Sequence, residues 1–172
     1  MKYFSIKFFY SKVIFYFLLI TFTLITLIFA GTHYRVTNEI VYDETTKLTW
    51  TRCSLLAGGS ADMSAACSGV KGELTWEEAV DACNHLNYSG RKDWRLPNIK
   101  ELKSIVVYNV DGTYPCINKM CFPNTKTSHY WSSTTHPYVN DNHTAFTLDY
   151  LAGNITYHMK TSRWYVRCVA GP

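Results

Sequence analysis

The stretch Asp93-Trp94-Arg95-Leu96-Pro97-Asn98 lies near the middle of the 172-residue chain and separates two kinds of backbone. Pro97 fixes its own φ angle, lacks an N–H donor, and pushes Leu96 towards an extended conformation. Asn98 is a typical helix N-cap, and Glu101 three residues later completes a capping box. The sequence therefore predicts that an extended segment ends here and that a helix begins.

This stretch also places an arginine and an acid beside a large aromatic residue, as an active site can. Trp94 and Leu96 alternate along an extended segment, however, so both side chains can point inward. Arg95 and Asp93 can pair with each other or satisfy nearby backbone groups. The surrounding window, residues 91–103, carries a net charge of +3. We interpret the stretch as part of the framework and the window as a solvated face, with contact to an anionic glycan as the alternative.

Two helices are predicted. The first has Thr75 as its N-cap and Glu78 at the position that closes a capping box. An apolar stripe follows at helical spacing. It consists of Trp76, Ala79, Val80, Cys83 and Leu86. The second helix is predicted over residues 99–107, directly after the stretch Asp93–Asn98.

Antiparallel strands are predicted on both sides of the helices. Residues 40–43 and 47–50 flank a short polar turn and are typical of a β-hairpin. Near the C-terminus, apolar residues alternate with polar ones on either side of a turn at 151–154, where Gly153 supplies a permissive φ angle. The later strands are predicted at residues 130–134, 146–150, 155–159 and 164–168. The fold class is therefore α+β, with a single domain over residues 31–172.

The N-terminus has the pattern of an export signal. Lys2, Lys7 and Lys12 precede an uncharged run from Val13 to Ala30. The 18 residues of this run exceed the usual signal-peptide core of about 7–15 residues and are just enough to span a bilayer. Residues 1–30 are therefore predicted to be a cleaved signal peptide or a retained membrane anchor. In either case residues 31–172 are expected outside the cytoplasm, and only residues 1–30 contact the membrane.

Six cysteines follow this segment, and an even number in an oxidising compartment predicts three disulfides. Proximity in the sequence suggests Cys53–Cys67 and Cys116–Cys121, which leaves Cys83 to pair with Cys168. A zinc site is the alternative, but the chain contains neither a C-x-x-C pair nor an H-x(3–5)-H pair. No metal ion or cofactor is therefore expected.

The charge of the exported part argues against nucleic acid as a partner. Three of the 17 basic residues lie in the N-terminal segment, and the remaining 14 face 13 acids, so residues 31–172 are close to neutral. A nucleic-acid-binding domain usually carries a clear excess of basic residues.

The middle of the chain contains two long polar loops, residues 108–129 and 135–143, and loops of this length on a rigid scaffold often bind ligands. His136 and His143 in the second loop are interpreted as solvent-facing imidazoles. The candidate ligand-binding residues of the two loops are Tyr114, Lys119, Lys126, His129, Tyr138 and His143.

Several motifs resemble the Lcl C-terminal domain family, which takes its name from the C-terminal domain of a bacterial collagen-like adhesin. They cover residues 40–169 in order. They are Leu48-x-Trp50-x-Arg52-Cys53, Trp76-x-x-Ala79-x-x-x-Cys83, Asp93-Trp94-Arg95-Leu96-Pro97-Asn98-x-x-Glu101-Leu102, Phe122-Pro123-Asn124-Thr125, Tyr130-Trp131-Ser132-Ser133-Thr134, Gly153 and Val166-Arg167-Cys168-Val169.

The resemblance implies a C-type-lectin-like fold, in which a helix cysteine joins one in the last strand, here Cys83 and Cys168. The adhesin binds sulfated glycosaminoglycans, but this chain lacks a collagen-like repeat and its domain is near neutral. The Glu-Pro-Asn and Trp-Asn-Asp motifs of calcium-dependent lectins do not occur here, so calcium-dependent sugar binding is not implied.

Three functions are consistent with the sequence. The first is a non-catalytic extracytoplasmic recognition or adhesion module for a glycan or protein on a surface, which the export signal, disulfides and loops favour. The second is an enzyme of the formylglycine-generating type, which would need a reactive, exposed cysteine pair. The third is a structural component of an envelope or pilus-like assembly. The sequence favours the first, because no residues converge on a catalytic mechanism.

Overall fold

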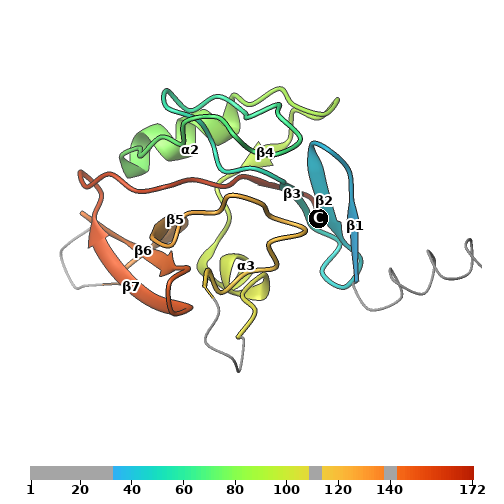
Figure 1. Ribbon diagram of the computed structural model, residues 1–172. Coiled ribbons are helices and arrows are strands. Elements are labelled where there is room, and N and C mark those ends of the chain that lie inside the picture. Colours follow the sequence, from blue (N-terminus) through green and yellow to red (C-terminus); the bar gives the residue numbers. More distant parts are fainter. Residues whose placement is uncertain (1–32, 109–113, 138–142) are drawn as a thin grey trace, which may run out of the picture. The chain divides into compact units, whose positions relative to one another are not determined.

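The computed structural model describes residues 33–108, 114–137 and 143–172. The predicted export segment, residues 1–30, lies outside this part of the chain. The described strands form two antiparallel sheets (Figure 1). The five-stranded sheet has the order β1 (Tyr34–Val36), β2 (Ile40–Asp43), β3 (Thr49–Thr51), β8 (Val169–Ala170), β4 (Trp94–Arg95). The three-stranded sheet has the order β5 (His129–Thr135), β6 (Thr144–Asp149), β7 (Asn154–Met159).

Two helices complete the described structure and confirm the α+β class. Both α2 (Trp76–Asn84) and α3 (Ile99–Ser104) begin at the predicted capping boxes. The helix α3 ends three residues earlier than predicted, because Val106 bridges Ile117 and the N–H of Val107 donates to Cys116 O. Neither helix is long and apolar enough to cross a membrane, a finding that extends only to the described residues.

The hydrophobic core consists of two clusters that meet at β5. Tyr130 belongs to the cluster that packs against α3, through Leu102 and Ile105. Its neighbour Trp131 points the other way, into the cluster that contains Ala79 of α2. In Figure 1, accordingly, α2 and α3 lie on opposite sides of β5. Because side chains alternate along a strand, one strand can contribute to the packing of both helices.

The stretch Asp93–Asn98 is part of the framework, as predicted. Trp94 and Leu96 are buried, and Trp94 Nε1 donates to Tyr88 O at 3.1 Å. Of the two alternatives for Arg95 and Asp93, the mutual pair does not form, since Asp93 pairs with Arg91, whereas Arg95 does reach a backbone group, with its Nη2 donating to Gly171 O at 3.2 Å. Arg95 also binds both carboxylate oxygens of Glu101, at 2.7 and 2.8 Å, because the capping box turns Glu101 back towards the strand.

Two of the three predicted disulfides are present. Cys53–Cys67 closes a loop, and Cys83–Cys168 joins α2 to the segment before β8. The third prediction is wrong, because Cys116 and Cys121 are free and buried. Their environments differ: the Cys116 thiol donates to Leu151 O at 3.3 Å, whereas Cys121 packs in the cluster around α3.

The C-terminal strands differ from the prediction at residues 164–168. The strand expected at residues 164–168 is reduced to single bridges, in which Trp164 pairs with Leu74 and Tyr165 with Tyr130, and β8 covers only Val169–Ala170. The hairpin of β6 and β7 forms as predicted, with Gly153 at φ +71° in its turn. However, the apolar face of β7 is exposed to solvent.

Candidate functional site

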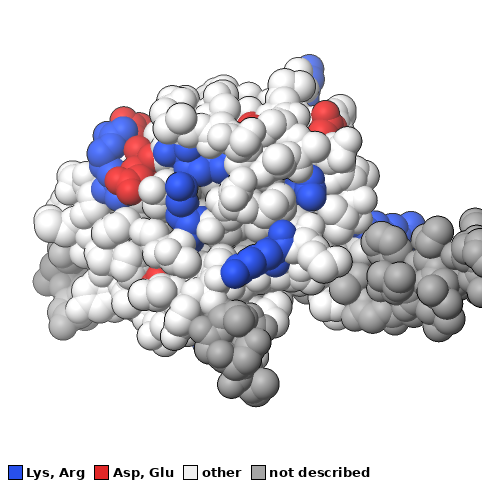
Figure 2. Space-filling model, in the orientation of Figure 1, with Lys and Arg blue, Asp and Glu red and all other residues white. Residues whose placement is uncertain are grey.

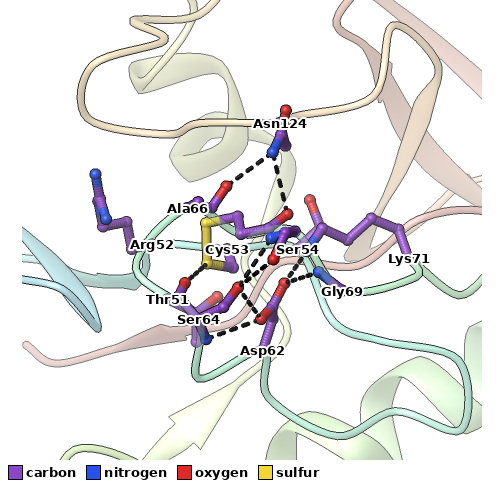
Figure 3. Close-up of polar contacts among 12 residues, drawn as sticks. Thr51, Arg52, Cys53, Ser54, Asp62, Ser64, Ala66, Gly69, Lys71 and Asn124 are labelled. Carbon is purple, nitrogen blue, oxygen red and sulfur yellow. Dashed lines mark hydrogen bonds and ion pairs between the residues drawn. A yellow bond between two sulfur atoms is a disulfide. The ribbon is translucent and has the colours of Figure 1, made fainter.

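The loop between Cys53 and Cys67 is organised around one buried carboxylate. Asp62 accepts hydrogen bonds from Ser64 N and Oγ and from Gly69 N, at 2.7–3.0 Å, and pairs with the ammonium group of Lys71. Both charged side chains are almost fully buried. Figure 3 shows this network beside the disulfide. The loop therefore has a fixed shape although it lacks regular secondary structure.

The electrostatics of this loop favour the charged form of the acid. Burial alone would raise the pKa of Asp62. The hydrogen bonds from Lys71, Ser64 and Gly69 outweigh burial and lower the pKa to about 2. Since Asp62 stays ionised and occupied with its own loop, it is not available as a general base for a ligand.

A second segment, residues 122–126, meets this loop from far along the chain. Asn124 has a φ angle of +50°, which asparagine tolerates well. Its Nδ2 donates to Ala66 O at 2.7 Å and to Cys67 O at 3.3 Å, as Figure 3 shows. One asparagine thus ties the two segments together.

Buried side chains hold this second segment in place. Arg167 is fully buried, and its Nη2 donates to Thr125 Oγ1 at 2.9 Å. The N–H of Lys126 donates to the hydroxyl of the buried Tyr130 at 3.1 Å. Burial lowers the pKa of Arg167, while the nearby hydroxyls of Tyr130 and Tyr150 act in the opposite direction. The segment is therefore anchored in the core of the domain.

A polar pocket of about 380 Å³ lies between the two segments. Its lining residues are Cys67, Ser68, Gly69, Lys71, Asn124, Thr125 and Lys126. They offer a hydroxyl, an amide, backbone groups and the ammonium group of the exposed Lys126. The lining contains no histidine or carboxylate, and its cysteine is in a disulfide. It can therefore hold a polar or anionic ligand, but it lacks a nucleophile–base pair.

The predicted candidates do not converge on this pocket. Only Lys126 lines it. Tyr114 and Lys119 are exposed in the segment before β5, and His143 is exposed just before β6. Tyr138 lies outside the described residues. The sequence analysis missed the other six lining residues, and the motif Phe122-Pro123-Asn124-Thr125 was the available signal for two of them, Asn124 and Thr125.

The histidines form aromatic contacts instead of a shared site. His129 and His158 lie 4.7 Å apart between ring centroids, and each ring contacts Trp164. Burial and the proximity of His129 lower the pKa of His158. His136 was predicted to face solvent, but it is half-buried and its ring lies 4.2 Å from that of Tyr157.

A metal site is not indicated by these side chains. Within residues 33–108, 114–137 and 143–172, no three His, Cys, Asp or Glu side chains gather closely enough to hold an ion.

The family model of the Lcl C-terminal domain matches residues 39–170. The chain belongs to this family. The Lcl C-terminal domain here therefore includes both sheets except for β1, both described helices, both disulfides and the whole polar pocket. No curated protein matches the chain.

The surface of this Lcl C-terminal domain is electrostatically mixed. In the view of Figure 2, Lys and Arg side chains are scattered among neutral residues, and some lie directly beside acids. Two exposed ion pairs, Arg91–Asp93 and Arg163–Glu78, are further examples of opposite charges side by side on the surface. A continuous basic groove of the kind that follows a nucleic-acid backbone is not visible on this face.

Proposed function

We propose that the chain is a non-catalytic, extracytoplasmic recognition module that binds a surface glycan through the polar pocket. The observation that carries the proposal is the composition of this pocket, which combines Ser68, Asn124 and Lys126 on walls fixed by buried side chains. Hydroxyl, amide and ammonium groups are suited to the hydroxyls and acidic substituents of a glycan. Rigid walls reduce the entropy cost of binding.

The extracytoplasmic location is part of the same proposal. Two disulfides, one closing a loop and one joining α2 to the end of the domain, support an oxidising compartment. The predicted export segment, residues 1–30, provides the route. A protein ligand on a surface is the alternative for the same module, and the proposed C-type-lectin-like fold would accommodate either.

The test is a glycan array combined with heparin chromatography of the purified full chain. We expect Lys126→Ala and Ser68→Ala to lower retention or array signal at least several-fold. The matched control is Lys119→Ala, which removes the same charge from an exposed position outside the pocket. If the chain gives no hits and no retention, the glycan proposal fails. If Lys119→Ala has the same effect as Lys126→Ala, binding depends on net charge and the pocket is not the site.

The enzyme alternative is less well supported. It would need an exposed cysteine pair of low pKa, as thiolates are the reactive species. Cys116 and Cys121 are the free cysteines of the described residues, and both are buried. Burial raises the pKa of the Cys121 thiol, which keeps it protonated at neutral pH. We therefore do not propose a redox activity.

A structural role in an assembly is the second candidate function, and one specific observation favours it. The strand β7 lies at the edge of its sheet and exposes Ile155, Tyr157 and Met159. An exposed, apolar edge strand is a site where another chain can pair.

A further inference from the structure

The strand β7 is the long unpaired edge of the described structure. It pairs with β6 on one side, and the described residues supply no strand on the other. The opposite edge of the same sheet is covered, because Trp131 N donates to Tyr165 O and Tyr165 N donates to His129 O. The sequence of β7, NITYHM, contains no charged residue and no proline. These are the residues that usually protect an edge strand from pairing.

The hydrogen bonds at the end of β7 show which backbone groups point outward. Lys160 N donates to His143 O at 2.7 Å. In an antiparallel ladder such pairs alternate, so His158 and Thr156 also direct their backbone groups towards β6. Ile155 and Tyr157 therefore direct their N–H and C=O groups towards the free edge.

The side chains beside this edge are apolar and exposed. The helix α3 packs across β5 and β6, and its principal contacts do not extend to β7. The exposed fractions of Ile155, Tyr157 and Met159 are 40%, 51% and 59%. The patch continues to the hairpin turn, where Tyr108 lies against Gly153 and donates to its carbonyl at 3.1 Å.

We infer that β7 pairs with β7 of a second copy of this chain, in an antiparallel arrangement about a two-fold axis through Thr156. In this register Ile155 of one copy faces Tyr157 of the other, and both residues direct their backbone groups outward. The two symmetry-related Ile155–Tyr157 pairs would form four N–H···O hydrogen bonds. They would join the two three-stranded sheets into a single six-stranded sheet. Each pair sets a β-branched side chain against an aromatic one, a favourable cross-strand combination.

The self-complementarity of β7 is the reason to choose a second copy as the occupant. Because the strand is uncharged, no like charges meet when it faces itself. The exposed apolar area around β7 is also adequate for an interface between two copies. Large side chains expose roughly 100 Å² each at these fractions. Five of them, Tyr108, Leu151, Ile155, Tyr157 and Met159, would give about 1,000 Å² from two copies before backbone is counted, close to the lower limit of specific interfaces.

The register can be tested by cysteine cross-linking of the full chain. Residues opposite each other in a non-hydrogen-bonded pair have Cα atoms about 4.5 Å apart, within the range of a disulfide. We expect Thr156→Cys to give a cross-linked dimer on a non-reducing gel under mild oxidation. Thr161→Cys, exposed just beyond the strand, is the matched control and should remain monomeric. Cross-linking of Thr156→Cys no stronger than that of Thr161→Cys would overturn the proposal.

A second experiment does not depend on Thr156, whose hydroxyl contacts Thr147 and two histidines. Tyr157→Lys places a charge on the proposed interface, and Val70→Lys places the same charge at a residue that is 81% exposed elsewhere. By sedimentation of the full chain in detergent, we expect Tyr157→Lys to weaken dimerisation at least tenfold and Val70→Lys to leave it unchanged. A monomeric parent chain at about 100 µM, or a Tyr157→Lys dimer as strong as the parent, would contradict the inference.

Discussion

The two sheets of the domain end in different ways. The five-stranded sheet ends on β1 and β4, strands of three and two residues, and each edge carries an arginine in an ion pair. The three-stranded sheet ends on β7, a strand of six residues without a charge. Short, charged edges resist pairing with other chains, whereas a long apolar edge permits it.

The difference extends to what holds each region in place. The five-stranded sheet is joined to α2 by the Cys83–Cys168 disulfide, and Trp94 of β4 is 2% exposed. The β7 strand has no disulfide, and none of its six residues is buried. Stabilising contacts are therefore concentrated around the five-stranded sheet, whereas β7 belongs to the surface of the domain. Four predictions test this contrast.

The largest expected loss in the free energy of unfolding comes from removing the Cys83–Cys168 disulfide, which joins α2 to the segment before β8. The residues of Cys83–Cys168 are 85 apart in the sequence, and those of Cys53–Cys67 are 14 apart. In the chain-entropy model, replacing the first pair by alanines costs about 4–5 kcal/mol and replacing the second costs about 3 kcal/mol. Urea unfolding of both double variants measures the difference. Equal losses would show that loop closure in the unfolded chain is not the main cause.

Trp94→Ala should have the next largest effect. It removes a buried aromatic side chain together with its hydrogen bond to Tyr88 O, so we expect a loss of about 3–5 kcal/mol in the free energy of unfolding. Lower yield of the purified protein should accompany this loss. Tyr114→Ala, at an exposed position, is the control for an aromatic truncation. A Trp94→Ala variant that unfolds like the parent but no longer binds glycan would return this stretch to the list of sites.

Local patterns in the sequence were sufficient to predict much of the five-stranded sheet and of the two helices. Both capping boxes, the first hairpin and the framework role of Trp94 depend on residues only a few positions apart. Proximity in the sequence predicted the Cys53–Cys67 disulfide correctly and the Cys116–Cys121 disulfide wrongly. Cys116 and Cys121 are five residues apart, yet one contacts the hairpin turn and the other the core around α3.

Features that depend on distant segments could not be predicted. The polar pocket lies between two segments that are joined by the hydrogen bond from Asn124 Nδ2 to Ala66 O, and these two residues are 58 apart in the sequence. Alternation in β6 and β7 predicts two faces but does not say which is covered. In β6 the small residues Ala145 and Thr147 are fully buried on one face, and on the other face Leu148 is fully buried while Phe146 is half-exposed, because neighbouring elements determine where each face is covered.

A smaller loss is expected from the buried ion pair of the Cys53–Cys67 loop. Asp62→Asn leaves Lys71 buried without its counter-charge, and we expect a loss of about 2–3 kcal/mol at pH 7. Because the folded-state pKa of Asp62 is lowered to about 2, its contribution is complete above the unfolded pKa of about 4 and disappears as the pH falls towards 2. Unfolding measured at pH 7, 4 and 2.5 should therefore show the parent and the variant converging, with most of the difference in stability lost at pH 2.5.

The control for this titration is Asp93→Asn, which removes an acid from an exposed pair with Arg91. It should leave stability nearly unchanged at pH 7, since solvent screens exposed pairs. A difference between the parent and Asp62→Asn that stays constant from pH 7 to pH 2.5 would mean that the Asp62 charge is not the source of the stability.

The smallest effect on the free energy of unfolding should follow from Tyr157→Ala in the edge strand β7. The side chain is 51% exposed and lies outside both core clusters, so its removal should change the free energy of unfolding of the monomer by less than about 1 kcal/mol. Tyr130→Ala in β5 is the matched comparison. That ring is fully buried, and its hydroxyl contacts Ser54 at 2.6 Å, so the expected loss is about 3–5 kcal/mol. Urea unfolding at low protein concentration separates the two variants. A loss for Tyr157→Ala as large as that for Tyr130→Ala would mean that β7 supports the fold, whereas an effect that appears only at high concentration would place the role of Tyr157 between two copies of the chain.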